Sequence, residues 1–389
     1  MAIDQNRDGP LLTLLRVAEI FAPEPSDATD ILIADGRIAA LGRNLSAPAD
    51  WPVELVEVPE VTAVPAFIDQ HVHVTGGGGE GGYGTRCPEI TAAEIAFRGI
   101  GTVVGVLGTD SVSRSPADLL AKVRGLRAEG IAAYMYTGAY RVPPPTLTGD
   151  LQRDLAWIPE VLGVGEVAIS DHRSSQPRQD EIERLVAEAR VGAMLAGKRG
   201  ICHFHVGDGK RGLEPLRRLL SETEIPADQV IPTHVNRHHA LLEEAAAFAT
   251  DFGASVDVTA FDDCPGDHEL SAFNAVSRLL ALGVPAQRIT MSSDCNGSLP
   301  AFDARGHYAG MRVAGNTALL ADWQRLVHEA VLPLDRALGL ISGHVARVLG
   351  LDRQKGRLAV GFDADITLLD SDLHPRRTFV AGRCVHAAG

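Results

Sequence analysis

Two histidines that alternate by two residues follow an apolar stretch near the start of the chain. Residues 65–73 read PAFIDQHVH and end in His71 and His73. In a β-strand, residues i and i+2 face the same side, so the two imidazoles would converge. Such a pair chelates transition metals, although an isolated pair is more often two polar residues at the mouth of a loop. Other residues of the chain must decide between these interpretations.

Further histidines and carboxylates follow later apolar stretches. Residues 202–208 contain His203 and His205, residues 233–237 contain His234, residues 292–294 end in Asp294, and residues 164–173 contain Glu166. Each residue taken alone is more often buried and hydrogen-bonded than bound to a metal. Their repetition at the ends of several predicted strands favours a metal site.

The middle of the chain alternates strand patterns with helical patterns, of which 180–195 and 241–252 are the clearest helices. The strand segments are 63–74, 102–107, 132–137, 163–170, 201–206, 230–235, 254–260 and 289–293. This alternation predicts an α/β fold, a parallel (β/α)8 TIM barrel. Chemistry in such barrels lies at the C-terminal ends of the strands, where the candidate ligands fall.

Short strand patterns flank this middle region on both sides. They cover 11–20, 30–33, 37–41 and 53–58 at the start, and 356–358, 364–369 and 379–385 at the end. Asp35-Gly36 between two apolar runs is a strong hairpin signal. We expect residues 1–62 and 346–389 to form one small β-sandwich domain, and residues 63–345 to form the barrel.

Composition limits the class of partner. The 50 acidic and 36 basic residues give a formal net charge of −14, which argues against binding to nucleic acid or an anionic membrane. The polar first ten residues lack the apolar region of a signal peptide, and no apolar run is long enough to span a membrane. Five cysteines without CxxC spacing favour a reducing compartment. We therefore expect a cytoplasmic protein.

Seven motifs, spread over nearly the whole chain, resemble those of the amidohydrolase superfamily and, within it, the isoaspartyl dipeptidases. They are FIDQHVHVTGGGGE, LGTDS, TGAYRVP, AISDHRS, FHVGD, PTHVNR and SSDCNGS. The resemblance implies a homo-oligomeric hydrolase with two divalent metal ions, usually zinc. His71, His73 and Asp294 would bind the more buried ion, and His205 and His234 the other. His203 would then support a ligand or fill the core.

The resemblance also implies the reaction and its substrate, a small dipeptide. A metal-bound hydroxide would attack the β-aspartyl amide, with Asp294 as general base and then general acid. Tyr140 would help to polarise the carbonyl under attack. The implied substrate contacts are Glu80 for the α-ammonium, Arg173 and Arg237 for carboxylates, and Thr109 and Ser298. The alternative for the two arginines is an ion pair near the site or on the surface.

The chain departs from this family at Glu166. Members of this type bridge their metals with a carbamylated lysine, whose carboxylate lies three side-chain atoms further from the backbone, roughly 3–4 Å. Glu166 could bridge two metals in a shifted site, support one metal, or leave the site impaired. Cys295 stands where a glycine is common, and would be either an extra soft ligand or a buried filler residue.

We therefore expect metal-dependent hydrolysis of isoaspartyl dipeptides. The first alternative is another amidohydrolase reaction, on cyclic amides or N-acyl amino acids. The second is a metal-binding relative without catalytic activity, retained as an assembly partner. The native metal, the number of ions, the residue preferred after isoaspartate, the oligomeric state and the physiological role stay open at this point.

Overall fold

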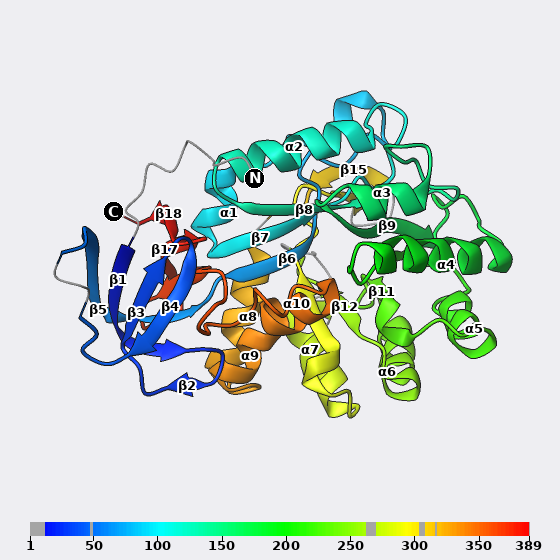
Figure 1. Cartoon of the computed structure of the whole chain (residues 1–389). Coiled ribbons are helices and arrows are strands. Elements are labelled where there is room, and N and C mark those ends of the chain that lie inside the picture. The colour runs from blue at the N-terminus through cyan, green and yellow to red at the C-terminus, as the bar shows by residue number, and fades with distance from the viewer. Residues whose placement is uncertain (1–11, 47–49, 262–269, 303–307, 316, 389) are drawn as a thin grey trace.

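The described residues contain eight parallel strands that surround a buried interior (Figure 1). The computed structural model describes residues 12–46, 50–261, 270–302, 308–315 and 317–388. The eight strands are β6 (Phe67–Val72), β7 (Ile100–Gly105), β8 (Ala132–Thr137), β9 (Val161–Ile169), β10 (Ile201–Val206), β11 (Val230–Thr233), β12 (Val256–Thr259) and β13 (Ile289–Ser292). They match the eight predicted strands.

The strands close into a ring. Hydrogen bonds join them in the order β11-β10-β9-β8-β7-β6, and β12 pairs with β13. The Val235 amide donates to the Asp257 carbonyl oxygen (3.5 Å), which links the end of β11 to β12. The His73 amide donates to the Cys295 carbonyl oxygen (2.9 Å), which links the end of β6 to the end of β13. The predicted TIM barrel is therefore confirmed.

Helices pack around the outside of the ring, so the strands are buried on both faces and read as near-continuous apolar runs. The helices are α1 (Ala92–Phe97), α2 (Pro116–Ala128), α3 (Leu151–Trp157), α4 (Gln179–Leu195), α5 (Glu214–Glu222), α6 (His239–Phe252), α7 (Ala272–Ala281), α8 (Ala318–His328), α9 (Leu334–Ile341) and α10 (Gly343–Leu349). A two-stranded hairpin, β14 (Ser298–Phe302) and β15 (Tyr308–Val313), follows β13.

Strands from both ends of the chain form the second, smaller part of the molecule (Figure 1). They are β1 (Leu12–Phe21), β2 (Pro25–Ser26), β3 (Asp30–Ala34), β4 (Arg37–Gly42), β5 (Val53–Pro65), β16 (Ile366–Leu369), β17 (Pro375–Val380) and β18 (Arg383–Ala387). Hydrogen bonds join them into one continuous sheet, in which β5 connects the N-terminal to the C-terminal strands. The predicted small β domain, assembled from strands of both ends of the chain, is therefore present.

Two local details of this sheet differ from the sequence prediction. The predicted strand 379–385 is two strands, because Ala381 and Gly382 take positive φ angles of 45° and 75° and form a turn. Residues 356–358 are not a strand. The predicted Asp35-Gly36 hairpin is confirmed, with both residues at positive φ between β3 and β4.

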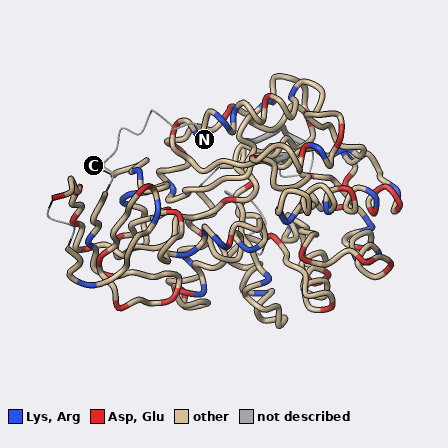
Figure 2. The backbone as a smooth tube through the Cα atoms, viewed as in Figure 1, with Lys and Arg blue, Asp and Glu red and all other residues tan. Residues whose placement is uncertain are grey.

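The surface of the barrel mixes charges. Figure 2 shows acidic and basic positions intermixed along the outer helices α4 and α5, whereas the charged positions of α6 are all acidic. None of the helices in the described part of the chain has the length and apolar character required to cross a membrane.

Candidate active site

Glu166 lies at the centre of the candidate ligands. Its side chain projects from β9 and is 1% exposed. Glu166 Oε2 lies 3.4 Å from His71 Nε2, 3.0 Å from His205 Nδ1 and 3.5 Å from His234 Nε2, and Oε1 lies 3.4 Å from His73 Nε2. One carboxylate therefore contacts all four histidines that the sequence analysis predicted as ligands.

Asp294 also belongs to the cluster. Its Oδ1 lies 3.3 Å from His71 Nε2 and 3.0 Å from His73 Nε2. Asp294 and His234 follow their strands with positive φ angles of 52° and 62°, a backbone conformation that is uncommon for residues other than glycine and is concentrated at functional sites. Within the described residues, two groups could hold a metal ion: His71 with Glu166 and His234, and His71 with His73 and Asp294.

The spacing of these atoms fits metal binding. Two ligand atoms that each lie about 2.0–2.2 Å from one tetrahedral zinc ion are separated by roughly 3.4 Å. The contacts in the cluster span 3.0 Å to 3.5 Å. His71 Nε2 and Asp294 Oδ1 are also buried without a hydrogen-bond partner among the described residues. Imidazole and carboxylate donors in this arrangement suit zinc or a similar divalent ion.

Electrostatics favour a cation among these groups. Burial raises the pKa of Glu166, but the neighbouring histidines lower it by more, to well below its usual range. Burial likewise raises the pKa of Asp294, and contacts with His71 and His73 bring it well below the usual range. Burial lowers the pKa of His73, but Asp294 and Glu166 raise it to about 9. The ionised carboxylates thus need positive charge close by, which a bound metal would supply.

Three of the four candidate metal-binding histidines have a hydrogen-bonding partner at the ring nitrogen that does not face Glu166. His203 Nε2 lies 2.8 Å from His71 Nδ1, and Thr259 Oγ1 lies 2.7 Å from His234 Nδ1. Asp171 Oδ2 lies 3.0 Å from His205 Nε2. Contacts of this kind fix the tautomer and orientation of metal-binding histidines. Each of these three histidines is therefore oriented by one further residue: His203, Thr259 or Asp171.

His205 rather than His203 faces Glu166, as the FHVGD motif suggested. His203 lies behind His71 and stacks on Tyr136, with ring centroids 5.0 Å apart. Cys295 is buried, its Sγ lies 3.2 Å from Asn296 Oδ1, and it belongs to neither metal-binding group of the described residues. The geometry favours the buried filler role for Cys295.

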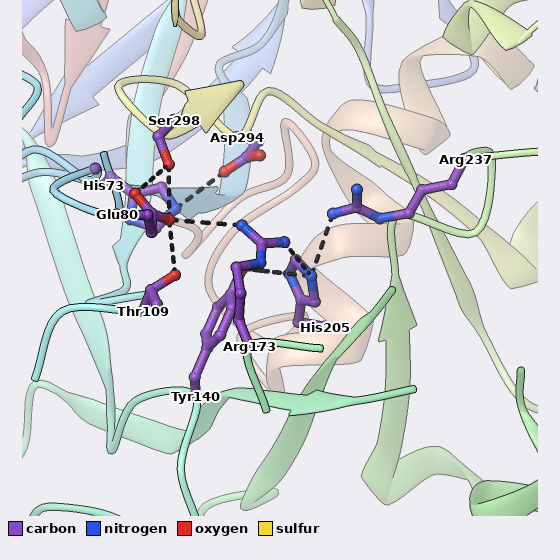
Figure 3. Close-up of a pocket in the computed structure, with 10 residues that line it drawn as sticks. His73, Glu80, Thr109, Tyr140, Arg173, His205, Arg237, Asp294 and Ser298 are labelled. Atoms are coloured by element: carbon purple, nitrogen blue, oxygen red, sulfur yellow. Dashed lines mark hydrogen bonds and ion pairs between the residues drawn. The ribbon is translucent and has the colours of Figure 1, made fainter. Parts of the chain in front are cut away.

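The predicted substrate residues line one pocket beside the cluster (Figure 3). Glu80 is its acidic member, and Glu80 Oε1 accepts hydrogen bonds from Thr109 Oγ1 (2.9 Å) and Ser298 Oγ (3.0 Å). Arg173 Nη1 lies 3.5 Å from the same oxygen. The pocket is lined by His73, Gly78, Glu80, Thr109, Tyr140, Arg173, His205, Arg237, Asp294 and Ser298. The structure therefore brings together all the substrate contacts that the resemblance implied.

Two arginines enter the pocket, each anchored along one edge. Arg173 Nε and Nη2 donate to the two oxygens of Asp171 (3.0 Å and 2.8 Å). Arg237 Nε donates to the Val206 carbonyl oxygen (2.8 Å). The Nη2 atoms of Arg173 and Arg237 lie 3.3 Å and 3.2 Å from His205 Nε2, at the edge of the metal cluster. The remaining N–H groups of both side chains are placed to bind an anion.

Tyr140 places a hydroxyl group next to the candidate ligands. Its oxygen lies 2.8 Å from His205 Nδ1. Burial raises the pKa of Tyr140 well above its usual value, and Glu166 raises it further, so the hydroxyl stays protonated. A protonated hydroxyl at this position can donate a hydrogen bond to a substrate oxygen.

The fold and this site define the class of the protein. The family model described as the amidohydrolase family matches residues 62–385, so the chain belongs to that family. A more specific similarity comes from a solved structure of a β-aspartyl dipeptidase from Fervidobacterium islandicum AW-1, in complex with the dipeptide β-Asp-Leu. It is 39% identical, with a TM-score of 0.90 and 97% of each chain covered.

Other relatives are more distant. A dihydroorotase from Lactiplantibacillus plantarum is 23% identical over 398 residues, which cover 93% of this chain and 90% of the relative. A D-hydantoinase structure has a TM-score of 0.64 at 16% identity, covers 97% of this chain and 95% of its own, and shows the shared fold.

Proposed function

We propose that this protein hydrolyses the β-aspartyl amide bond of isoaspartyl dipeptides. The observation that carries the proposal is the charge of the pocket, which offers Arg173 and Arg237 for anions and Glu80 for a cation beside the metal-binding cluster. An isoaspartyl dipeptide has two carboxylates and one ammonium group, so each would find an opposite charge. The 39% identity to a β-aspartyl dipeptidase supports the same substrate class.

The charges also argue against the leading alternative. Dihydroorotate, the substrate that the name dihydroorotase implies for the curated relatives, has one carboxylate and no ammonium group. An N-acyl amino acid likewise has no α-ammonium group. Either molecule would leave Glu80, whose cationic neighbour in the pocket is Arg173 (3.5 Å), without a contact to a cationic substrate group.

We further propose that two divalent ions, such as zinc, bind at this cluster and that Glu166 bridges them. His71, His73 and Asp294 would hold one ion, and His205 and His234 the other. When bound, these ions would supply an activated water and polarise the scissile carbonyl. Glu166 suits the bridging role because Oε1 faces His73 and Oε2 faces His205 and His234.

The residues of the chain would perform the remaining steps. Glu80 binds the α-ammonium group, while Arg173 and Arg237 bind the carboxylates, which fixes the β-amide over the cluster. Tyr140 donates a hydrogen bond to the oxygen of the scissile carbonyl as negative charge develops there. Asp294 accepts the proton of the attacking water and passes it to the departing amine.

The test is a substrate panel on protein loaded with zinc: β-Asp-Leu, α-Asp-Leu, dihydroorotate and an N-acetyl amino acid. We expect turnover of β-Asp-Leu alone. Replacing one charge-assisted contact, as in Arg237→Met, should lower kcat/KM by about 10- to 100-fold. Arg141→Met is the matched control, because Arg141 lies on the surface and does not line the pocket. Turnover of dihydroorotate but not of β-Asp-Leu would overturn the proposal.

A further inference from the structure

One buried carboxylate, that of Asp171, contacts both a candidate metal ligand and a candidate substrate arginine. Its side chain is 4% exposed and lies two residues beyond the end of β9. Asp171 Oδ1 accepts from the backbone amide (2.7 Å) and Nε (3.0 Å) of Arg173. Asp171 Oδ2 accepts from Arg173 Nη2 (2.8 Å) and lies 3.0 Å from His205 Nε2. These four contacts use the full acceptor capacity of the carboxylate.

The contact with His205 determines which ring nitrogen carries the proton. His205 Nδ1 points to Glu166 Oε2 (3.0 Å), so this nitrogen is the one placed to bind a metal, and Nε2 must then carry hydrogen. The other neighbours of Nε2 are the Tyr140 hydroxyl oxygen at 3.3 Å and guanidinium nitrogens of Arg173 and Arg237, at 3.3 Å and 3.2 Å; the guanidinium nitrogens cannot accept a hydrogen bond. Among the described contacts of Nε2, Asp171 Oδ2 is the shortest (3.0 Å) and the only carboxylate, whereas the Tyr140 oxygen lies closer to Nδ1 (2.8 Å).

The local backbone makes this shared contact possible. Gly207 follows β10 and approaches Asp171 so closely that a Cβ atom at Gly207 would lie 2.5 Å from Asp171 Cβ. This approach of the chain beyond β10 to the chain beyond β9 places Asp171 within reach of His205. A larger residue at position 207 would force the two segments apart.

We propose that Asp171 is a positioning residue that couples metal binding at His205 to carboxylate recognition by Arg173. The part that concerns Arg173 rests on the proposed function, whereas the part that concerns His205 does not. Because one carboxylate holds both side chains, loss of its charge releases both. Loss of the Arg173 side chain, in contrast, leaves the contact between Asp171 and His205 in place.

The experiment compares Asp171→Asn with Arg173→Met and with the control Asp208→Asn, whose exposed side chain lies on the same rim. Zinc affinity is measured by competition with a chelator, the visible spectrum of bound cobalt reports ligand geometry, and KM is measured for β-Asp-Leu. We expect Asp171→Asn to weaken zinc binding by about 10- to 100-fold, to change the cobalt spectrum, and to raise KM. Arg173→Met should raise KM and leave zinc affinity within about twofold, and Asp208→Asn should match the wild type.

The outcomes separate this inference from the proposed function. Wild-type zinc affinity and cobalt spectrum in folded Asp171→Asn would overturn the coupling. Weakened zinc binding in a protein whose wild type does not cleave β-Asp-Leu would refute the proposed function while retaining the contact to His205. If Asp171→Asn does not fold, Asp171→Glu carries the same comparison, because it keeps the charge and displaces the carboxylate by one methylene. Wild-type zinc affinity in that variant would also count against the coupling.

Discussion

Arg114 holds the glycine-rich segment 75–79, which directly precedes the pocket residue Glu80. Its substitution tests whether this segment positions Glu80. The Arg114 side chain is 3% exposed and donates to the carbonyl oxygens of Gly77 (2.8 Å), Gly78 (3.1 Å) and Thr75 (3.4 Å). Its Nη1 also donates to Asp110 Oδ2 (3.2 Å). The loop after β7 therefore fixes the loop after β6 through a single guanidinium group.

The substitution Arg114→Met keeps an unbranched side chain and removes every one of these donors. A hydrogen bond to a charged group contributes about 1.5–3 kcal/mol, so the two shorter carbonyl contacts account for about 3–6 kcal/mol. For 389 residues the entropy of unfolding is about 0.8 kcal/mol per kelvin, which converts this loss into a fall in Tm of about 4–7 °C. Because Glu80 directly follows the released segment, KM for β-Asp-Leu should rise at least about tenfold, with a smaller change in kcat.

Differential scanning fluorimetry and steady-state kinetics measure the two effects. Arg114→Lys should recover part of both, because an ammonium group keeps the charge but cannot reach three carbonyl oxygens as the guanidinium fork does. A fall in Tm with an unchanged KM would show that Arg114 stabilises the fold without positioning Glu80. An unchanged Tm would refute the energetic argument itself.

Three other predictions concern single substitutions. Asp294→Asn should lower kcat by about 10²- to 10⁴-fold with an unchanged circular dichroism spectrum, whereas unfolding would make the residue structural. Gly108→Ala should lower bound zinc, measured by metal analysis, because its Cβ would lie 2.6 Å from His73 Cε1; Gly149→Ala is the control, with positive φ but open space around it. Burial lowers the pKa of Lys355, but Asp365, Tyr134 and Asp363 raise it above its usual 10.5. Its contribution is therefore complete below about pH 10.5 and lost as pH rises further, so the Tm deficit of Lys355→Met should be constant between about pH 6 and 9 and shrink above about pH 10.5.

The barrel was predictable because its strands are buried on both faces and therefore read as apolar runs. The candidate ligands were predictable because a TIM barrel collects its chemistry at the strand ends. Contacts between segments that are distant in the sequence could not be predicted. Thr259 ends a buried strand without any distinctive pattern, and nothing local shows that it faces His234. Asp171 lies in a recognised motif, but its contact with His205 depends on how β9 and β10 pair.

The contacts of the Glu166 carboxylate could also not be predicted from the sequence. Side-chain length alone indicates a carboxylate roughly 3–4 Å short of the position that a carbamylated lysine would reach. In the structure, Glu166 nevertheless contacts all four candidate histidines within 3.5 Å. The number of atoms in a side chain is fixed by the sequence, whereas the distance from β9 to the histidines depends on the packing of the whole barrel.

A glutamate at this position should make metal binding independent of carbon dioxide. A carbamate forms only when a neutral lysine amine reacts with carbon dioxide, whereas the Glu166 carboxylate is permanent and is held ionised by the surrounding histidines. Metal-free protein should therefore recover zinc content and activity equally in buffer purged of carbon dioxide and in buffer with bicarbonate. Glu166→Lys should recover them only with bicarbonate, and more slowly at lower pH, where the amine is protonated. Bicarbonate dependence of the wild-type protein would contradict the assignment of Glu166 as the bridging carboxylate.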